Sequence, residues 1–560
     1  MNSNYPSNLR PVIATPPTGR AILFAAGALA CALALPPAAT AAEAAGTAKP
    51  QEDGSAWWMT PMNAEAAAML KKLRESEISQ MKVAGKFTLA VGGDVIQTVP
   101  IANLEDPSVQ GVLKIIRGAD VAFANSEANM TDYLTETGQV GVLTGPKEIA
   151  ADLKAQGFDI LQRSSNHSTT MGTDRMLKSN AALTEVGLPF AGSGRNLQEA
   201  RAPAYAITPK GRVGLVSMFS YPALNYQQPF GMSSVSDSGA GQAATYQMGN
   251  RGGLPGVNPM RLFKTVLVPQ EDLDALRRVA TATAEGGRKT LADYKASSGA
   301  ESTARPPNFD VDQDPKSPVV LNDVRYALGP RGGLSYRMYP DDEAQNMRSI
   351  RQAKEAADFV ITSIHSHESP SAYQFDFMQQ QPTDFLVKLA HEAIDNGADA
   401  FVGTGVHVLR GIEIYKGRPI FYGMMSYIYQ ITNTPIAYDR YRDNGLNPFT
   451  TEYTENELNW KGWPPLNVLN HPDPMNNESM ESVVGQATYQ DGKLTEVRIY
   501  PIDFGYGRPM SQKGTPRLST GIPAQRILSR MQRISKVLGT NLTIQDNVGI
   551  IKVGADGKSQ

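Results

Sequence analysis

The chain has 560 residues, of which 41% are hydrophobic, so it can form one large or two ordinary domains and is too long for a disulfide-stapled miniprotein. Its 53 basic and 55 acidic residues give a net charge of -2, which argues against a broadly basic surface for nucleic acid. The 50 glycines and 38 prolines indicate many loops and no long coiled coil.

The first 42 residues have the pattern of an export signal. Arg10 and Arg20 precede an apolar run over 21–35, and small residues follow at 39–41, where a signal peptidase would cut. We therefore expect a cleaved signal peptide over 1–42 and a periplasmic or extracellular protein. A transmembrane anchor is the alternative, although about 15 apolar residues fall short of the roughly 20 that span a bilayer.

Cys31, the single cysteine, lies inside this segment, and a lipoprotein anchor at Cys31 is a further alternative. Once the segment is removed, the mature chain contains no thiol. It could then use no disulfide, no cysteine ligand and no cysteine nucleophile.

From residue 86 onward, apolar strand runs alternate with helical patterns, as in an α/β domain. Residues 43–85 before it form an expected linker with an amphipathic helix at 63–82. The strand runs are 87–91, 121–124, 158–161, 359–364 and 400–402, and helices are expected at 107–117, 146–156, 176–186, 342–357 and 384–396.

Polar residues follow each of these strands, at the position where ligands collect in open α/β sheets. Four of the six histidines stand there: His167, His365, His367 and His407. Asp94, Glu127, Asn166 and Glu368 occupy equivalent positions. This nitrogen and oxygen donor set predicts a site for one or two divalent transition-metal ions. The alternative is a polar network without metal in a sugar- or peptide-binding groove.

Residues 222–340 are rich in Gly, Pro, Ser and Gln, so we expect a loop-rich insertion with some structure of its own, such as a rim or lid. Paired strands at 482–489 and 494–500, a helix at 523–538 and a strand at 549–553 should complete the domain. The domain thus spans 86–553, followed by a tail over 554–560.

Several short motifs follow one another along the chain in a characteristic order. They are Gly93-Asp94, Asn125-x-Glu127, Asn166-His167, Gly192-Ser-Gly194, His365-Ser-His-Glu368, the block from Gly403 to Glu413 with Tyr415, Gly417, Pro419 and Tyr422, and the C-terminal pieces at 481–483, 491–501 and 538–540. Together they resemble the CapA-type capsule or poly-gamma-glutamate biosynthesis proteins, a branch of the calcineurin-like metallophosphoesterase fold.

The resemblance implies a four-layer α/β/β/α sandwich of the metallo-dependent phosphatase type, with a metal centre at one edge. The positions that resemble metal ligands are Asp94, Glu127, Asn166, His365 and His407. His167 resembles the histidine that protonates a leaving group, and His367 and Glu368 are further catalytic candidates. The implied cofactor is one or two ions of Mn, Fe or Zn, with metal-activated water as nucleophile.

Two residues just beyond His407 are candidate substrate-binding residues. Arg410 and Glu413 could orient an anionic polymer such as poly-gamma-glutamate, and a structural salt bridge at the sheet edge is the alternative.

Three places depart from the family pattern. Thr404 replaces the first His of Gly-His-Gly-Pro-His, and Thr170 stands where an Asp usually follows Asn-His. Ser426 lies in Met-Met-Ser-Tyr, where Leu-Gly-Asn-Phe is frequent. Because partners around a ligand fix its orientation and basicity, a single-metal or catalytically altered member remains an open alternative.

We therefore expect an exported metal-dependent hydrolase that acts in the biosynthesis or processing of an anionic cell-envelope polymer. Its expected partners are that polymer or a peptide and membrane polymer-synthesis proteins, with no nucleic acid. Two alternatives stay open: a non-catalytic binding component of a polymer synthesis or export complex, and a metal-assisted proton-abstraction enzyme.

Overall fold

The computed structural model describes residues 83–132, 143–170, 172–222, 242–247, 252–299, 310–371, 380–430, 480–505, 508 and 512–560. All of them belong to one compact unit, Glu65–Gln560. The expected signal peptide at 1–42 and the helix at 63–82 lie outside these residues.

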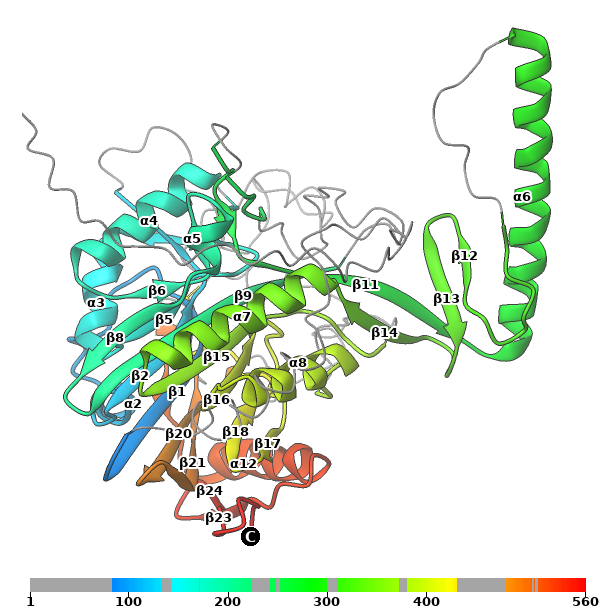
Figure 1. Ribbon diagram of the computed structural model, residues 1–560. Coiled ribbons are helices and arrows are strands. Elements are labelled where there is room, and N and C mark those ends of the chain that lie inside the picture. Colours follow the sequence, from blue (N-terminus) through cyan, green and yellow to red (C-terminus); the bar gives the residue numbers. More distant parts are fainter. Residues whose placement is uncertain are drawn as a thin grey trace, which may run out of the picture. The chain divides into compact units, whose positions relative to one another are not determined.

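The first sheet has ten strands, in the order β23-β24-β21-β20-β1-β2-β5-β6, with β19 beside β1 and β22 beside β21 (Figure 1). The strands β1, β2, β5 and β6 are parallel, whereas β20, β21 and β24 join antiparallel. The bounds are β1 Lys86–Ile96, β2 Val121–Ser126, β5 Ile160–Gln162, β6 Phe190–Ala191, β19 Ile428–Tyr429, β20 Glu481–Gln490, β21 Lys493–Asp503, β22 Arg517–Leu518, β23 Thr543–Gln545 and β24 Val548–Lys552.

The second sheet also has ten strands, in the order β12-β13-β11-β9-β15-β16-β18-β17, with β14 beside β11 and β8 beside β9. Its centre, from β11 to β18, is parallel. The bounds are β8 Ala204–Thr208, β9 Gly211–Pro222, β11 Pro259–Val268, β12 Val319–Leu321, β13 Val324–Leu328, β14 Gly333–Met338, β15 Phe359–His365, β16 Ala400–Thr404, β17 Ile412–Tyr415 and β18 Arg418–Phe421. Two short pairs, β3 Asn129–Thr131 with β4 Thr144–Pro146 and β7 Ser193–Gly194 with β10 Gly256–Val257, lie apart from both sheets.

The two sheets share the largest hydrophobic core. Phe87 of β1 packs on Phe359 of β15 with 5.0 Å between ring centroids, and Phe359 lies 5.2 Å from Tyr489 of β20. All three rings are fully buried, which explains why the strand runs read as nearly continuous apolar stretches.

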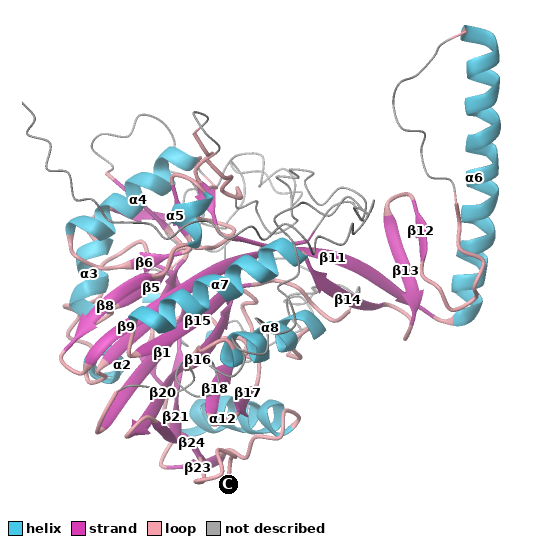
Figure 2. Ribbon diagram, viewed as in Figure 1, coloured by secondary structure: helices cyan, strands magenta, loops and turns pink. Residues whose placement is uncertain are grey.

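Helices lie along the sheets (Figure 2), and their buried apolar residues complete the core. The helices α2 Pro107–Arg117, α3 Ile149–Gln156, α4 Thr173–Glu185 and α12 Gly521–Lys536 contribute to the core of the first sheet. The helices α7 Pro340–Ala356 and α8 Asp384–Asp395 pack on the second sheet in a separate apolar cluster, and α5 is Leu197–Arg201. Asp106 caps α2, since its side chain accepts from the Ser108 amide.

Within the described residues, the helices and strands expected from periodicity are confirmed, with one correction in β1. The expected strand over 87–91 continues through Gly92-Gly93 to Ile96, with a register shift between Val91 and Asp94. A side chain at Gly93 would place Cβ 1.5 Å from the Met425 carbonyl oxygen, so this close approach requires glycine.

The expectation of a loop-rich insertion over 222–340 is wrong for most of its described residues. Strands β11 and β14 belong to the second sheet, and α6 Gln270–Ser298 is a helix of 29 residues. Only four side chains of α6 are buried, so its sequence lacks the broad apolar stripe that marks a packed helix. The expected tail at 554–560 also folds back, and the Gln560 amide donates to the Lys552 carbonyl at 2.9 Å.

Within the part of the chain that the structure describes, no helix has both the length and the apolar character needed to cross a membrane.

Candidate metal centre

Polar side chains from both sheets meet where their parallel strands end. Asp94 of β1 is in register with Asn125 of β2, and Glu127 follows β2 directly. In the second sheet, His365 ends β15 in register with Thr404 of β16. Asn166 and His407 follow β5 and β16. The predicted convergence of strand ends is therefore what the structure shows, because both sheets direct their carboxyl ends to this place.

His365 is the fully buried centre of the cluster. Its Nε2 lies 2.9 Å from the Asn166 Oδ1 and 3.6 Å from the Glu127 Oε1. Its Nδ1 lies 3.5 Å from the Asp94 Oδ1 and 3.1 Å from the Thr404 hydroxyl. One imidazole thus contacts residues of both sheets.

His407 approaches Asp94 from the other side. Its Nδ1 lies 3.5 Å from the Asp94 Oδ2, which also accepts from the Gly405 amide at 3.0 Å. The turn that carries them is unusual, because Gly405 has φ 96° and His407 has φ 49°. A non-glycine residue in the left-handed region costs energy, and such residues occur in tight turns and cluster at active sites and ligand-binding loops.

Glu127 gives the clearest sign that something is to be bound. Both of its carboxylate oxygens are buried and have no hydrogen-bond partner among the described residues, and the same holds for the Asn125 Oδ1. Ligand atoms of Asp94, Glu127 and His407 all lie within 4.8 Å of one another. Because an unpaired buried carboxylate is costly, and this donor set suits a transition metal, the cluster could hold a metal ion.

The ionisable groups of the cluster have shifted pKa values. Burial raises the pKa of Glu127 well above its usual value, and the charge of Asp94 raises it further. Burial would also raise the pKa of Asp94, but the hydrogen bond from His365 and the charges of His365 and His407 hold it below its usual value. The pKa of His407 is lowered because burial outweighs the attraction of Asp94. Perturbed groups that converge in this way are typical of functional sites.

Two further predicted histidines lie beside the cluster and are only partly buried. The His367 ring centroid is 4.8 Å from that of His365 and 6.0 Å from that of His407. His167 follows Asn166, and its Nδ1 contacts the Thr170 hydroxyl at 3.1 Å. Burial lowers the pKa of His167 to about 3, and burial with the neighbouring histidines lowers that of His367, so both imidazoles are neutral near pH 7.

Glu368 and Arg410 form an adjoining buried network. The Glu368 carboxylate accepts from the hydroxyls of Ser220 and Ser366, the latter at 2.7 Å. The Arg410 guanidinium donates to the Glu368 carbonyl at 2.7 Å, and its side chain is only 1% exposed. These contacts place both residues next to His367, and their catalytic and substrate-binding roles remain predictions.

Glu413 makes its contacts elsewhere. Its carboxylate accepts from the Tyr422 hydroxyl and contacts His391 Nε2 at 3.0 Å, and His391 stacks on Tyr415 with 3.8 Å between centroids. The described residues thus show Glu413 in contact with His391 of α8 and with Tyr422, and not with the cluster.

Sequence reasoning did not assign site roles to three residues that touch the cluster. The Asn125 amide donates to the Asp94 Oδ1 at 2.7 Å and lies 3.0 Å from the His365 Nδ1. Thr404 and Ser426, read only as departures from a pattern, contact His365 and His407 through their hydroxyls. The available sequence signal was position, since Asn125 comes directly after the apolar run at 121–124, and the structure sets it in register with Asp94.

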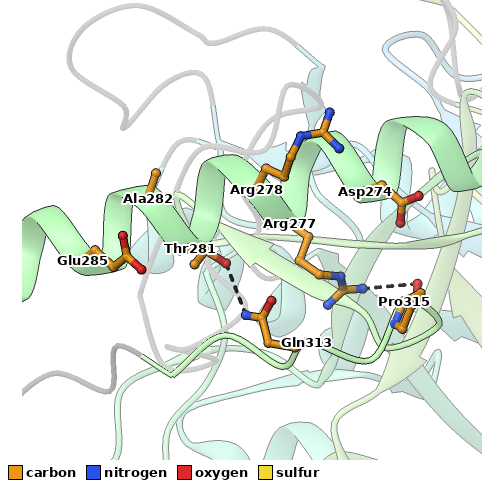
Figure 3. A pocket seen from close by; sticks show the side chains of 8 residues that line it. All are labelled: Asp274, Arg277, Arg278, Thr281, Ala282, Glu285, Gln313 and Pro315. Atoms are coloured by element: carbon orange, nitrogen blue, oxygen red, sulfur yellow. Dashed lines mark hydrogen bonds between the residues drawn. The ribbon is translucent and has the colours of Figure 1, made fainter.

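A groove of about 540 Å³ lies away from these residues, between α6 and the segment at 313–315. In Figure 3, the Arg277 guanidinium points toward Pro315, to whose carbonyl it donates at 3.3 Å, while Arg278 points away. Gln313 donates to the Thr281 hydroxyl at 3.2 Å. No predicted site residue lines this groove.

Two mixed sheets with a buried carboxylate, amide and imidazole cluster at their adjoining strand ends define an α/β protein with a candidate metal centre. A family model described as "Bacterial capsule synthesis protein PGA_cap" matches residues 88–251 and 269–430. The chain belongs to this family, which confirms the resemblance seen in its motifs and supports a role related to capsule biosynthesis.

The chain is also similar in sequence to three proteins. "Uncharacterized protein y4sH" and "Uncharacterized protein y4uA" of Sinorhizobium fredii are each 33% identical over 480 residues, covering 83% of this chain and 93% of each relative. "PGA biosynthesis protein CapA" of Bacillus subtilis is 32% identical over 107 residues, covering 19% of this chain and 25% of that protein.

Proposed function

We propose that this protein is an exported metal-dependent hydrolase that acts on an anionic cell-envelope polymer during capsule biosynthesis. The observation that carries the proposal is the Glu127 carboxylate, which is buried without a hydrogen-bond partner among the described residues and lies close to Asp94 and His407. An ion at this position would compensate the charge that burial otherwise penalises. The name of the Bacillus subtilis relative favours poly-gamma-glutamate as the polymer class.

The proposed architecture is the four-layer sandwich of the metallo-dependent phosphatases. It is supported by the core that both sheets share and by the separate helix cluster on the second sheet. In this arrangement, the adjoining carboxyl ends of the central strands carry the metal centre.

The proposed ligands are Asp94, Glu127, Asn166, His365 and His407, and the donor set suits Mn, Fe or Zn. A bound divalent ion would polarise a substrate oxygen and lower the pKa of water at the site. Asn125 and Thr404 hold the His365 ring through its Nδ1 side. The Gly405 amide and Asn125 orient Asp94 by donating to its two oxygens.

Proton transfer is assigned to the half-buried histidines. His167 is neutral near pH 7, and its ring can donate or accept a proton at the nitrogen that does not contact Thr170. His367 stands beside the cluster as a second neutral imidazole, with Glu368 behind it. A polymer chain would reach these rings before it reached the fully buried His365.

Elemental analysis of protein purified without added metal tests the first part of the proposal. We expect stoichiometric Mn, Fe or Zn that survives dialysis and is lost in Glu127→Gln and His407→Ala. The matched controls are Glu413→Gln and His391→Ala, which remove a carboxylate and an imidazole outside the cluster. Wild-type protein without metal, even after incubation with these ions, would contradict the proposal.

Turnover tests the second part. Metal-loaded protein should cleave either a phosphodiester or a gamma-glutamyl substrate, and His167→Ala should abolish cleavage while retaining metal. Binding of poly-gamma-glutamate without cleavage would instead support a non-catalytic component of a polymer complex. Solvent deuterium incorporation without bond cleavage would support proton abstraction.

A further inference from the structure

A buried arginine contacts the backbone on either side of Glu127. Arg163 follows β5, and its side chain is fully buried. Its Nη1 donates to the carbonyls of Ser126 and Ala128 at 2.7 and 3.0 Å. These are the two carbonyls that flank Glu127, so the backbone that carries this carboxylate curves around the guanidinium.

The same guanidinium also reaches the neighbourhood of His167. Its Nη2 donates to the Asn129 Oδ1 at 3.0 Å, and the Asn129 amide donates to the His167 carbonyl at 2.8 Å. Glu127 and Ala128 are held from the opposite side, since both of their amides donate to the Val95 carbonyl of β1. One planar donor fork thus joins the segment of Glu127 to the loop of His167.

Stability alone is a poor explanation for this residue. Within the described part of the chain, all of the recorded acceptors of Arg163 are neutral: two carbonyls and the side-chain amides of Asn129 and Asn180. Burial of the cation is costly enough to lower its pKa to about 10. A buried charge without an opposite charge is destabilising, and an apolar side chain would fill the same volume at lower cost.

We infer that Arg163 is a positioning residue that sets the Glu127 carboxylate and the His167 imidazole in one fixed relation. This inference rests on the proposed function, because Glu127 is taken as a metal ligand and His167 as the proton-transfer residue. The planar guanidinium is essential for this role, since a lysine at position 163 would carry the same charge but could not donate hydrogen bonds along three fixed directions.

The test compares Arg163→Lys with Arg530→Lys in the full chain. Arg530 of α12 is also buried, and its partner Glu481 keeps a second bond from Arg526, so this control matches the burial and the substitution away from the cluster. Circular dichroism and thermal melting report the fold. Binding of Co²⁺ is measured by calorimetry, and its visible absorption spectrum reports the geometry of the ligands.

Arg163→Lys should weaken Co²⁺ binding about 10- to 100-fold and change the Co²⁺ spectrum, as for other residues that orient a ligand. Arg530→Lys should leave both unchanged. If Arg163→Lys binds Co²⁺ with wild-type affinity and spectrum, or if both variants weaken binding equally, the inference is overturned.

A second variant keeps the inference testable if Arg163→Lys does not fold. Asn129→Ala removes the link from Arg163 to His167 and a 3.4 Å contact with the Ser179 hydroxyl, but it leaves the Arg163 bonds to the carbonyls of Ser126 and Ala128. Co²⁺ affinity should therefore stay within about twofold while the imidazole resonance of ¹⁵N-labelled His167 shifts in the metal-free protein. The His167→Ala spectrum assigns this resonance. An unchanged resonance would overturn the link. If wild-type protein binds no Co²⁺, the proposed function fails, and the resonance alone then decides the role of Arg163.

Discussion

The Nε2 atom of His365 lies 2.9 Å from the Oδ1 atom of Asn166, although 199 positions separate the two residues. Asn166 follows β5 of the first sheet, and His365 ends β15 of the second. The candidate metal centre therefore exists only while the two sheets keep their relative position. Core residues between the sheets should affect the centre, whereas core residues elsewhere should not.

Phe359→Ala tests this dependence. Phe359 is fully buried between Phe87 and Tyr489, so its truncation should cost about 3–5 kcal/mol of unfolding free energy. We also expect weaker metal binding, because the cavity lies between the sheets. Phe385→Ala in α8 is the control, since it opens a similar cavity in the separate helix cluster. Denaturant unfolding measures the loss of stability, and calorimetry measures the metal affinity. Equal metal affinity in both variants would contradict the prediction.

Gly405→Ala should damage the centre directly. The glycine has φ 96°, and an added Cβ would lie 2.9 Å from the Ser366 amide nitrogen and 3.0 Å from the His365 ring. Because the Gly405 amide also donates to Asp94, we expect a loss of more than about 1 kcal/mol in stability together with weaker metal binding. Gly539→Ala has a similar φ of 76° but open space around the added carbon, so it should cost stability without loss of metal affinity.

The pH dependence of the stability of the metal-free protein should reveal the cost of burying the Glu127 carboxylate. Its pKa is raised above the ordinary 4.5 in the folded state, so the folded state holds the proton more tightly than the unfolded state. Stability should therefore fall as pH rises from about 4.5 toward the folded pKa, by about 1.4 kcal/mol for each unit of the raise.

Glu127→Gln should remove this decline, and the variant without metal should be more stable than wild type at pH 7 and similar at pH 4. Metal should stabilise wild type and not the variant. Thermal melting across pH, with and without metal, measures both effects. A wild-type protein that gains stability from pH 4.5 to 7 as the variant does would show that Glu127 is not penalised by burial.

His167→Ala should separate binding from chemistry. General acid or base catalysis contributes about 10²–10⁴-fold, so turnover should fall by this factor while metal content stays unchanged. His391→Ala, which removes an imidazole bound to Glu413, should retain turnover within about twofold. Single-turnover kinetics with metal-loaded protein give the comparison. Loss of metal in His167→Ala would instead make His167 a ligand.

Much of the site could be predicted from the sequence because the strands end where their polar residues begin. Asp94, Glu127, Asn166, His365 and His407 each follow a buried apolar run, and parallel strands bring such positions together. The length of α6 could not be predicted in this way, because a helix with few buried side chains shows no apolar periodicity. The contact of Glu413 with His391 of α8 could not be predicted either, since the two residues lie 22 positions apart.

Local patterns determined the main strands, the amphipathic helices and the donor types, since each depends on side chains close together along the chain. The order of the motifs along the sequence determined the family. The tertiary structure decided which donors share one buried space. It paired His365 with Asn166 across two sheets, left Glu127 without a hydrogen-bond partner among the described residues and bonded Arg163 to the backbone on either side of it. These relations depend on packing between distant segments, where burial and not sequence spacing sets the cost of every unpaired polar atom.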